Sequence, residues 1–473
     1  MVDGKVLAAR FAGAADFETR KVISGGNELE IFFLDGLTSG RDIADFIVRP
    51  LHEARQDERE ETLFTRAERG LVWCASMKKA SSTDEAAELL VNGFCVILFP
   101  KSGKALGCEV KTGEKRSPSA PEAENTVKGA KDAFTETIRT NTSLIRRHLR
   151  TPELRLEESV VGRRSLTKVT VCWVEGLTDP ELPARMKKRL GEIDIDGLLS
   201  PAAVEEYVTG SRKTAFPLLE FTERTDHFCQ GLLDGQVGLL VDGLPIGYLA
   251  PVSFGRLMRS PEDRATDYLS ASMLRSLRYL ALGVSLLLPG IYAAMAMFHQ
   301  QMLPTKLLLS IIESKQDVPF STLFEVVGLL CAFELLQQAG LHLPQAIGTA
   351  VSIIGGLVVG TAAVDAKLVS PAALIVTASS GICGFTLPNR ELSDALRLWR
   401  LGLTVLGGVL GLFGVTAGLL LLLIKLAGLE SLGRSYLAPF GEAEVKGALV
   451  RERLAEQKWR DGMLRPIDER NQR

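Results

Sequence analysis

Two acidic side chains lie where a lipid bilayer would tolerate them least. Glu325 and Glu334 interrupt residues 318–341, a segment that is otherwise apolar overall. An ionised carboxylate at bilayer depth costs about 2.5–3.5 kcal/mol, so such residues often serve a pore or a partner. At about 100° per residue, their spacing places them on opposite sides of a helix. We therefore predict two separate gating or channel candidates; the alternative is an interfacial helix whose acids reach water.

Small residues line one face of the apolar segment that follows. Gly348, Ser352, Gly356 and Gly360 recur every four residues, and the last two form a GxxxG motif. Such a face lets helix backbones approach closely in lipid. Ordinary helix packing explains this pattern, and the wall of a gated constriction is the sharper hypothesis. Pro289, inside the first apolar segment, predicts a kink that is either structural or a hinge.

No residue pattern indicates catalysis. The motifs HExxH, GxSxG and GxxxxGK[ST] are missing from the sequence, and its five histidines are scattered. The seven cysteines include no CxxC pair, which favours small buried side chains in a reducing compartment over a zinc site or a disulfide framework. We predict no enzyme activity, no cofactor and no metal. The net charge of −2 gives no support for nucleic-acid binding.

The elements that must position these residues fall into two halves. The composition of residues up to about 278 predicts a soluble region, whereas four later segments contain no Asp, Glu, Lys or Arg. Each segment is close to or above the roughly 20 apolar residues that cross a bilayer. The four segments are 279–298, 343–364, 368–388 and 401–424. This organisation favours sensing, gating, transport or anchoring over a free cytosolic enzyme.

The soluble half is predicted to hold two α/β units. Runs rich in β-branched residues at 94–99 and 168–174 predict strands, and the turn DGLP at 242–245 predicts a hairpin. Helices are predicted at 130–149 and 182–199. The fold class is therefore a two-part α/β soluble domain followed by an all-α membrane domain. The expected parts are 1–115 and 116–259 for the soluble units, 260–427 for a bundle of about five spans, and 428–473 for a charged tail.

Charged residues predict the orientation in the membrane. Residues 1–17 carry several charges and no apolar core, so they are no secretory signal, and the soluble half is expected in the cytoplasm. Arginines precede both the first and the last apolar segment, as is typical of cytoplasmic loops. Both clusters are cytoplasmic only if 318–341 also crosses, which predicts five crossings and a tail on the side opposite the soluble domain. The clusters are Arg264, Arg275 and Arg278, and Arg390, Arg397 and Arg400.

A series of short phrases resembles the A subunits of the GerA family of spore germinant receptors, over about residues 30–440. No single phrase is specific, and the resemblance rests on their number, order and spacing. They include NTSLIRR (141–147), GRRSLTK (162–168), TERTD (222–226), LLDG (232–235), SPED (260–263), LLPGIY (287–292), FHQ (298–300) and LPN (387–389). The related sporulation protein SpoVAF shares the fold and stays an alternative.

This resemblance implies a multi-pass protein of the spore inner membrane in endospore-forming bacteria. Family A subunits act with a transporter-like B subunit, thought to bind the nutrient, and with a lipoprotein C subunit. The A subunit is thought to form a homo-oligomeric cation channel whose opening starts germination. The implied partners are therefore the B and C subunits, further copies of this chain, and membrane lipid.

Three positions of segment 318–341 depart from the family pattern. Leu330, Gln337 and Gln338 stand where relatives often carry charged residues. The loss of these charges argues against a fixed ion-pair network on this helix. It leaves Glu325 and Glu334 as the acids to test.

We therefore expect a membrane subunit that transduces nutrient binding into germination as an oligomeric, ligand-gated cation channel. The alternative is a non-conducting scaffold or accessory subunit that assembles the germination complex. A secondary transporter is less expected, because it usually needs more spans and an internal repeat with broken helices. A membrane-anchored enzyme is disfavoured because no site motif is present.

Overall fold

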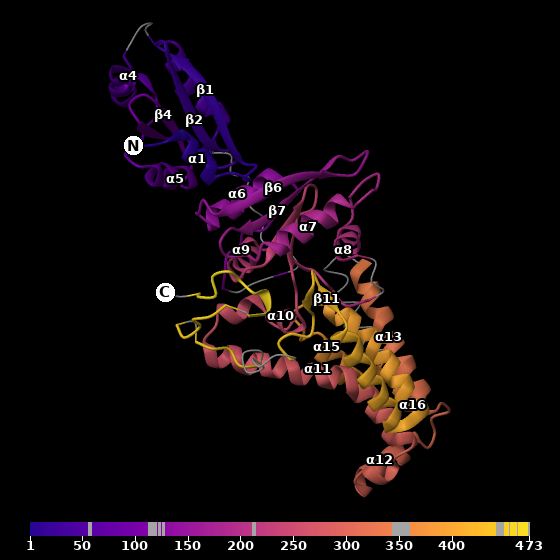
Figure 1. Ribbon diagram of the computed structural model, residues 1–473. Coiled ribbons are helices and arrows are strands. Elements are labelled where there is room, and N and C mark those ends of the chain that lie inside the picture. The colour runs from indigo at the N-terminus through magenta and orange to yellow at the C-terminus, as the bar shows by residue number, and fades with distance from the viewer. Residues whose placement is uncertain are drawn as a thin grey trace.

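The computed structural model describes residues 1–54, 59–111, 121, 124, 128–210, 214–342, 360–440, 449–453, 455–460 and 462–471. Figure 1 shows a first sheet with its helices at the top, a second sheet in the middle and a helical region below. The N-terminus lies in the upper part. The predicted fold class, a two-part α/β soluble region followed by a helical membrane region, is confirmed.

The first sheet has five strands, all paired antiparallel, in the order β1-β2-β4-β5-β3. Helices cover both of its faces: α1 and α5 pack on one, and η1, α3 and α4 on the other. The predicted strand at 94–99 is β4, whose residues are all buried because both faces are covered. The elements are α1 (Gly4–Arg10), β1 (Phe17–Ser24), β2 (Asn27–Leu34), η1 (Ile43–Val48), α3 (Arg49–His52), α4 (Glu60–Arg66), β3 (Met77–Ala80), α5 (Thr83–Val91), β4 (Phe94–Phe99) and β5 (Lys104–Glu109).

The second sheet repeats this strand order as β6-β7-β9-β10-β8. α7 and α8 pack on one face, and α6 and α9 pack on the other. The predicted strand at 168–174 is β7, and the predicted hairpin at 242–245 joins β9 to β10. The shared topology of the two units was not predicted. The elements are α6 (Ile138–His148), β6 (Leu154–Val161), β7 (Thr167–Val174), α7 (Glu181–Gly191), α8 (Pro201–Thr209), β8 (Glu220–Thr222), α9 (Thr225–Asp234), β9 (Val237–Val241) and β10 (Gly247–Ala250).

Both helices predicted for the second unit are shorter than expected. α6 begins only at Ile138, whose N–H donates to the carboxylate of Asp242 at 3.0 Å. Before the helix, the backbone N–H and carbonyl of Thr135 bond to the side chain of Asn141 in α6, so these groups are satisfied without a further helical turn. α7 ends at Gly191, and the carbonyl of Ile195 instead accepts from the N–H of Arg163 at 2.8 Å.

A buried ion pair joins the two soluble units. Arg146 of α6 donates to both carboxylate oxygens of Asp16 at 2.8 and 2.9 Å, and the two side chains are 1% and 2% exposed. The N–H of Ala15 also donates to the carbonyl of Leu156 on β6 at 2.8 Å. Breaking a buried pair by removing one partner costs about 3–5 kcal/mol. The contact therefore holds the two units in a fixed relation.

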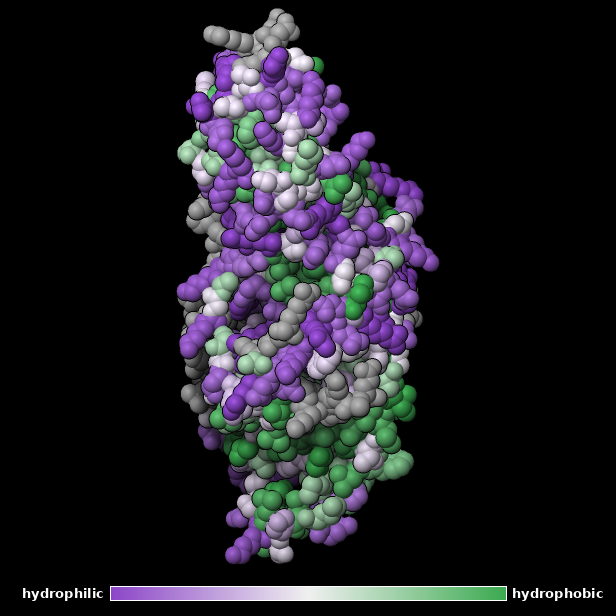
Figure 2. Space-filling view, turned by 60° about the vertical axis from the view of Figure 1, so that its left-hand side comes forward, coloured by the Kyte–Doolittle hydropathy of each residue, from purple (hydrophilic) through white to green (hydrophobic). Residues whose placement is uncertain are grey.

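Three helices are long and apolar enough to cross a membrane: α11 (Tyr268–Met297), residues Thr322–Ala339 of α13 (Thr322–His342), and α16 (Arg390–Ala427). α15 (Pro371–Gly384) is shorter, and α12 (Thr305–Lys315) lies at the end farthest from the soluble units (Figure 1). In Figure 2, hydrophobic residues gather over the helical region, with hydrophilic residues above them and at the lower tip. The predicted span 343–364 lies outside the described residues except for 360–364, which are helical.

α16 is a hairpin and not a straight helix. Gly411 has φ +67° and ψ −153°, a conformation essentially restricted to glycine. Lys425 Nζ lies 5.8 Å from the ring centroid of Trp399, although a straight helix would separate these positions by about 39 Å. A Cβ on Gly418 would likewise meet the side chain of Leu403 at 2.5 Å. The two halves therefore run antiparallel, and the chain returns toward the soluble units.

The C-terminal tail packs on the soluble domain. Ser431 Oγ donates to the carbonyl of Leu218 at 2.6 Å, and the N–H of Ile467 donates to the carbonyl of Leu177 at 2.8 Å. The predicted single crossing by 401–424 is wrong, and so is the predicted tail on the opposite side from the soluble domain. Hydropathy counts apolar residues and does not detect a chain reversal at one glycine. The remaining short elements are α2 (Gly40–Asp42), η2 (Ala67–Leu71), α10 (Phe254–Leu257), η3 (Pro261–Arg264), η4 (Gln300–Met302), β11 (Glu430–Ser431), β12 (Arg434–Ser435) and η5 (Gly462–Leu464).

Cysteine labelling should place the soluble domain and the tail on one side of the membrane. In a chain without its native cysteines, Ser81→Cys and Glu456→Cys should react with a membrane-impermeant maleimide in the same vesicle orientation. Gln316→Cys, between α12 and α13, should react in the opposite orientation; all three positions are exposed. Reaction of Glu456→Cys together with Gln316→Cys would contradict the hairpin.

Candidate functional site

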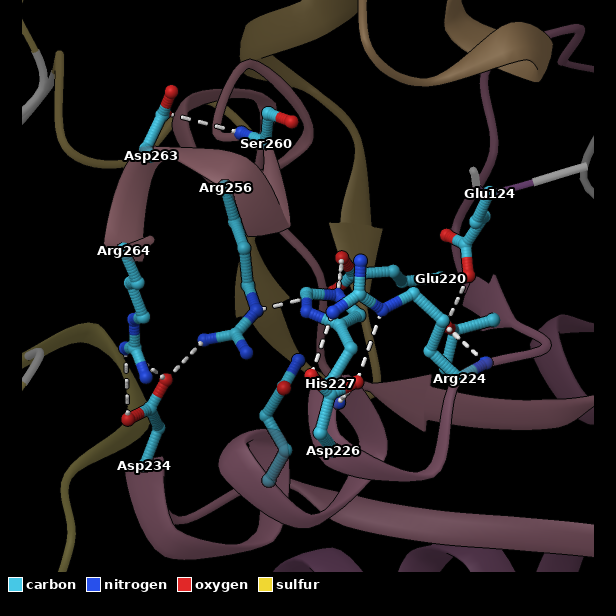
Figure 3. Close-up of polar contacts among 12 residues, drawn as sticks. Glu124, Glu220, Arg224, Asp226, His227, Asp234, Arg256, Ser260, Asp263 and Arg264 are labelled. Atoms are coloured by element: carbon cyan, nitrogen blue, oxygen red, sulfur yellow. Dashed lines mark hydrogen bonds and ion pairs between the residues drawn. The ribbon is translucent and has the colours of Figure 1, made fainter. Parts of the chain in front are cut away.

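Two adjacent sets of ion pairs lie between the second sheet and the first membrane helix, and Arg256 is the centre of the first set (Figure 3). Arg256 is only 7% exposed. Its Nε donates to Glu220 Oε2 at 3.1 Å, and its Nη1 donates to Asp234 Oδ2 at 3.1 Å. The side chain of Ser253 accepts from the N–H of Arg256 and caps the short helix α10. This cap fixes the backbone that carries the guanidinium group.

Glu220 supplies the acid on the sheet side of Arg256. It lies on β8, and its Oε1 is 2.8 Å from Nε2 of His227 on α9. Burial by itself raises the pKa of Glu220, but the charges of His227 and Arg256 outweigh it and lower the pKa to about 2. The carboxylate therefore stays ionised at neutral pH although it is almost completely buried.

Asp234 supplies the second acid, at the C-terminal end of α9. The helix dipole disfavours a carboxylate there. Burial also raises the pKa of Asp234, but the charges of Arg256 and Arg264 lower it further than burial raises it. Arg264 Nη2 lies 3.3 Å from Asp234 Oδ2, and both guanidinium groups point toward this carboxylate (Figure 3). Two arginines from the membrane side thus hold an acid of the soluble domain.

Asp263 forms a second set of ion pairs with α11, and it is joined to the first set through the backbone of the next residue, Arg264. It forms a capping box with Ser260 at the start of η3 and is 2% exposed. Its Oδ2 lies 2.8 Å from Nη1 of Arg278 and 3.4 Å from Nη2 of Arg275, both on α11. The arginine cluster that sequence analysis used for membrane orientation is therefore paired with acids of the junction. A displacement of β8 or α9 would act directly on the start of a membrane helix.

Glu325 holds the end of a neighbouring membrane helix. Its side chain is 0% exposed, and its Oε1 lies 3.1 Å from Lys315 Nζ. Its Oε2 accepts from the N–H of Ser370 at 2.9 Å, at the N-terminus of α15, where a negative charge is favoured by the helix dipole. Glu325 therefore accepts a hydrogen bond from the N-terminus of α15 and also balances the charge of Lys315.

Glu334 lies in an ion-pair network, contrary to what the missing family charges suggested. Its Oε1 is 2.7 Å from Arg400 Nη2 and its Oε2 is 3.4 Å from Arg397 Nη1. Arg400 is 3% exposed, and its Nη1 also donates to Ser380 Oγ at 3.4 Å. Ser380 Oγ donates to the carbonyl of Ser285 at 2.7 Å. α13, α16, α15 and α11 thus share one polar chain, and Arg397 and Arg400 are partners of an acid as well as charges near a membrane end.

Pro289 lies next to the closest approach of two membrane helices. A Cβ on Gly290 would meet the carbonyl of Leu403 at 2.9 Å, and a Cβ on Gly407 would meet the carbonyl of Gly290 at 2.4 Å. Only glycines allow α11 and α16 to touch backbone to backbone there. The small-residue pattern predicted close helix packing at residues 348–360, and no sequence pattern indicated the pair Gly290 and Gly407.

The glycine-rich face predicted for residues 348–360 is described only at its end. Gly348, Ser352 and Gly356 lie outside the described residues. Gly360 has Leu374 at an ordinary contact distance of 3.6 Å from its Cβ position. Gating by this face therefore stays a prediction.

The sequence marked Arg264, Arg275 and Arg278 only as charges of membrane orientation, and it did not mark the centre of the junction network. Arg256, Glu220 and Asp234 come from three different elements, and no local spacing joins them. The one signal was that the phrases LLDG and SPED, which carried the family resemblance, contain Asp234 and Asp263. Acids inside such phrases were thus the best available pointers to the network.

Substitution of Glu220 should lower the free energy of unfolding at neutral pH. It should also make that free energy depend less on pH in acid. The pKa of Glu220 is about 2 in the folded chain, below its ordinary value of 4.5. Its stabilisation is therefore fully present above about pH 4.5 and is lost as the pH falls toward 2, and it amounts to roughly 3 kcal/mol. Glu220→Gln should show this loss at pH 7 in thermal or denaturant unfolding of the full chain, with a smaller slope between pH 4.5 and 2.

Glu61→Gln is the matched control, because Glu61 is 79% exposed and only loosely paired with Lys104. It should change the free energy of unfolding by less than about 1 kcal/mol. If Glu220→Gln keeps the acid slope of the unchanged chain, the ionised state of Glu220 does not stabilise the junction.

Comparison with known proteins identifies close similarities over most of the chain. The family model described as Bacillus/Clostridium GerA spore germination protein matches residues 5–463. The chain is 34% identical to the uncharacterized membrane protein YfkQ of Bacillus subtilis strain 168, over 89% of this chain and 82% of that protein. It is 33% identical to spore germination protein KA of the same strain, over 89% and 78%. For spore germination protein XA of Bacillus anthracis the identity is 34%, over 77% and 74%.

One solved structure is also similar, the crystal structure of the N-terminal domain of the A subunit of the Bacillus megaterium spore germinant receptor GerK3. It shares 25% identity, has a TM-score of 0.42, and covers 53% of this chain and 93% of that chain. The family model spans nearly the whole chain, and the three relatives exceed 30% identity over more than three quarters of it. The chain belongs to the GerA family of spore germination proteins.

Proposed function

We propose that this chain is the membrane subunit of a spore germinant receptor, which transduces nutrient binding into germination as an oligomeric, ligand-gated cation channel. Two sets of ion pairs, one from β8 through Arg256 to Arg264 and one from Asp263 to α11, meet at neighbouring residues of η3, and this arrangement is the observation that carries this proposal. We place the protein in the spore inner membrane with its soluble domain in the cytoplasm. Its proposed partners are a transporter-like B subunit, a lipoprotein C subunit and further copies of itself.

The ion pairs give the soluble domain a stiff mechanical link to the membrane helices. Arg256 is buried between two acids of the soluble domain, and Asp263 is buried against two arginines of α11, so moving either one costs the pairing energy of buried charges. α11 in turn touches α16 backbone to backbone at Gly290 and Gly407. A nutrient-bound partner therefore needs only a different affinity for two positions of the soluble domain to shift the membrane helices.

Conduction is supported by a charge balance inside the helical region. Glu334 balances the charge of Arg400 and also contacts Arg397. Asp394 lies 3.1 Å from Arg397, so the two acids share this guanidinium group. A cation pathway beside this cluster depends on that balance, because an uncompensated guanidinium group repels cations electrostatically.

A non-conducting scaffold is the second candidate, and one observation favours it. Both intramembrane acids are already neutralised by basic residues of the same chain, Glu325 by Lys315 and Glu334 by Arg400. Acids that are fully paired can serve helix packing alone. The two functions differ in whether the purified oligomer passes ions.

Removal of the Glu334 charge should lower cation flux. With the purified oligomer in potassium-loaded liposomes, Glu334→Gln should reduce potassium release at least threefold, because Arg400 then lacks its acid. The double variant Glu334→Gln with Arg400→Gln should regain most of the flux. Potassium release is followed with an ion-selective electrode.

Glu313→Gln is the matched control, because Glu313 lies exposed on α12 and should leave the flux unchanged. Liposomes that stay silent with the unchanged chain would support the scaffold. Equal flux through the unchanged chain and Glu334→Gln would refute a role of this charge in the pathway.

A further inference from the structure

A cavity of about 630 Å³ lies where the soluble domain meets the membrane helices. Its walls come from α8, from residues 214–218 and from the first turns of α16. Figure 1 shows α8 directly above the ends of the membrane helices. Four acids line it, Glu205 and Glu206 from α8 and Glu391 and Asp394 from α16. The cavity therefore joins two parts of the chain through acidic side chains.

The negative charge of this cavity lacks a matching positive charge among its described lining residues, which include no lysine, arginine or histidine. Asp394 is paired with Arg397 outside the cavity. The carboxyl groups of Glu205 and Glu391 instead lie within hydrogen-bond reach of each other. Burial raises the pKa of Glu205, which shows how poorly the site tolerates its own charge. The neighbouring Arg189 is paired with Glu192 at 3.6 Å.

Buried polar atoms without hydrogen-bond partners lie in the cavity wall at Glu391 and, outside the lining, at two tyrosines on which the charges of its acids act. Tyr248 and Tyr436 are both 0% exposed, and neither hydroxyl has a hydrogen-bond partner within the part of the chain that the structure describes. Oε2 of Glu391 is likewise buried without one. The charge of Glu391 acts on both tyrosines, and that of Glu205 acts on Tyr248. Buried polar atoms without partners are rare in folded proteins and require a specific explanation.

The size and walls of the cavity favour an organic cation over a metal ion. Within the described residues, no group of three or more His, Cys, Asp or Glu side chains is placed to hold a metal. The volume falls in the range of small-molecule sites. Phe216 and Pro217 contribute apolar atoms to the same lining. A ligand with its own carboxylate would be repelled.

We propose that this cavity binds a small alkylammonium or diamine cation, with an ammonium group that contacts the carboxylates of both Glu205 and Glu391 from the cavity side. The bound cation supplies the positive charge that the described lining residues lack, and its alkyl part lies against Phe216. Because Glu205 belongs to the soluble domain and Glu391 to a membrane helix, the ligand ties the two together. This site is distinct from the ion pairs of Arg256 and does not depend on conduction.

Calorimetric titration of the full chain in detergent with 1,4-diaminobutane tests the proposal. Binding should saturate at one diamine per chain, and Glu205→Gln and Glu391→Gln should each weaken it at least tenfold. Phe216→Leu should weaken it about threefold through loss of apolar contact with the alkyl part. Asp194→Asn is the control, because Asp194 is exposed on the same soluble unit and lies away from the cavity.

Comparison ligands separate a specific site from general charge attraction. Potassium chloride and succinate, which has the chain length of the diamine but two carboxylates, should give no saturable signal. Absence of diamine binding to the unchanged chain, equal binding by potassium, or binding that survives both glutamine substitutions would overturn the proposal. If Glu391→Gln does not fold, Glu205→Gln on the soluble side decides alone. None of these measurements uses ion flux, so the channel proposal can fail without affecting them.

Discussion

The reversal of α16 at Gly411 is the constraint on which the arrangement of the two halves depends. A side chain at this position would meet His299 at 2.7 Å, and the backbone angles suit only glycine. Because the chain turns back, Leu422 and Leu426 join one apolar core with Leu392 and with residues of the soluble domain. The tail then reaches the second sheet and packs against it. A straight α16 would remove all of these contacts at once.

Pairing of buried charges is the second organising principle, and it works on both sides of the junction. Charges that leave water are tolerated only with partners of opposite sign. Arg256 satisfies this rule with two acids, and Arg400 satisfies it with Glu334. The cavity at Glu205 and Glu391 breaks the rule within the described residues, which makes it stand out as a place for an external cation. The same physics thus describes the rigid link and the open site.

The candidate site was predictable only where one residue contrasts with its neighbours along the chain. Glu325 and Glu334 could be found because an acid in an apolar window is visible by itself. Their partners were not, since Arg400 is 66 positions away from Glu334, and its charge was interpreted only as a signal of orientation. The positive-inside rule counts basic residues near membrane ends and carries no information about what they contact. Arg256 had no local signal at all.

By itself, the sequence determined the soluble and apolar halves, the main strands such as β4 and β7, the missing catalytic motifs and the family. Each of these follows from residue type and periodicity within a short window. Only the tertiary structure decided the hairpin, the side of the tail, the two sets of ion pairs and the acidic cavity. One glycine among 44 sets the reversal, and nothing in its neighbours marks it. Which distant charges meet depends on how helices and sheets pack in space, and that packing is decided by the whole chain together.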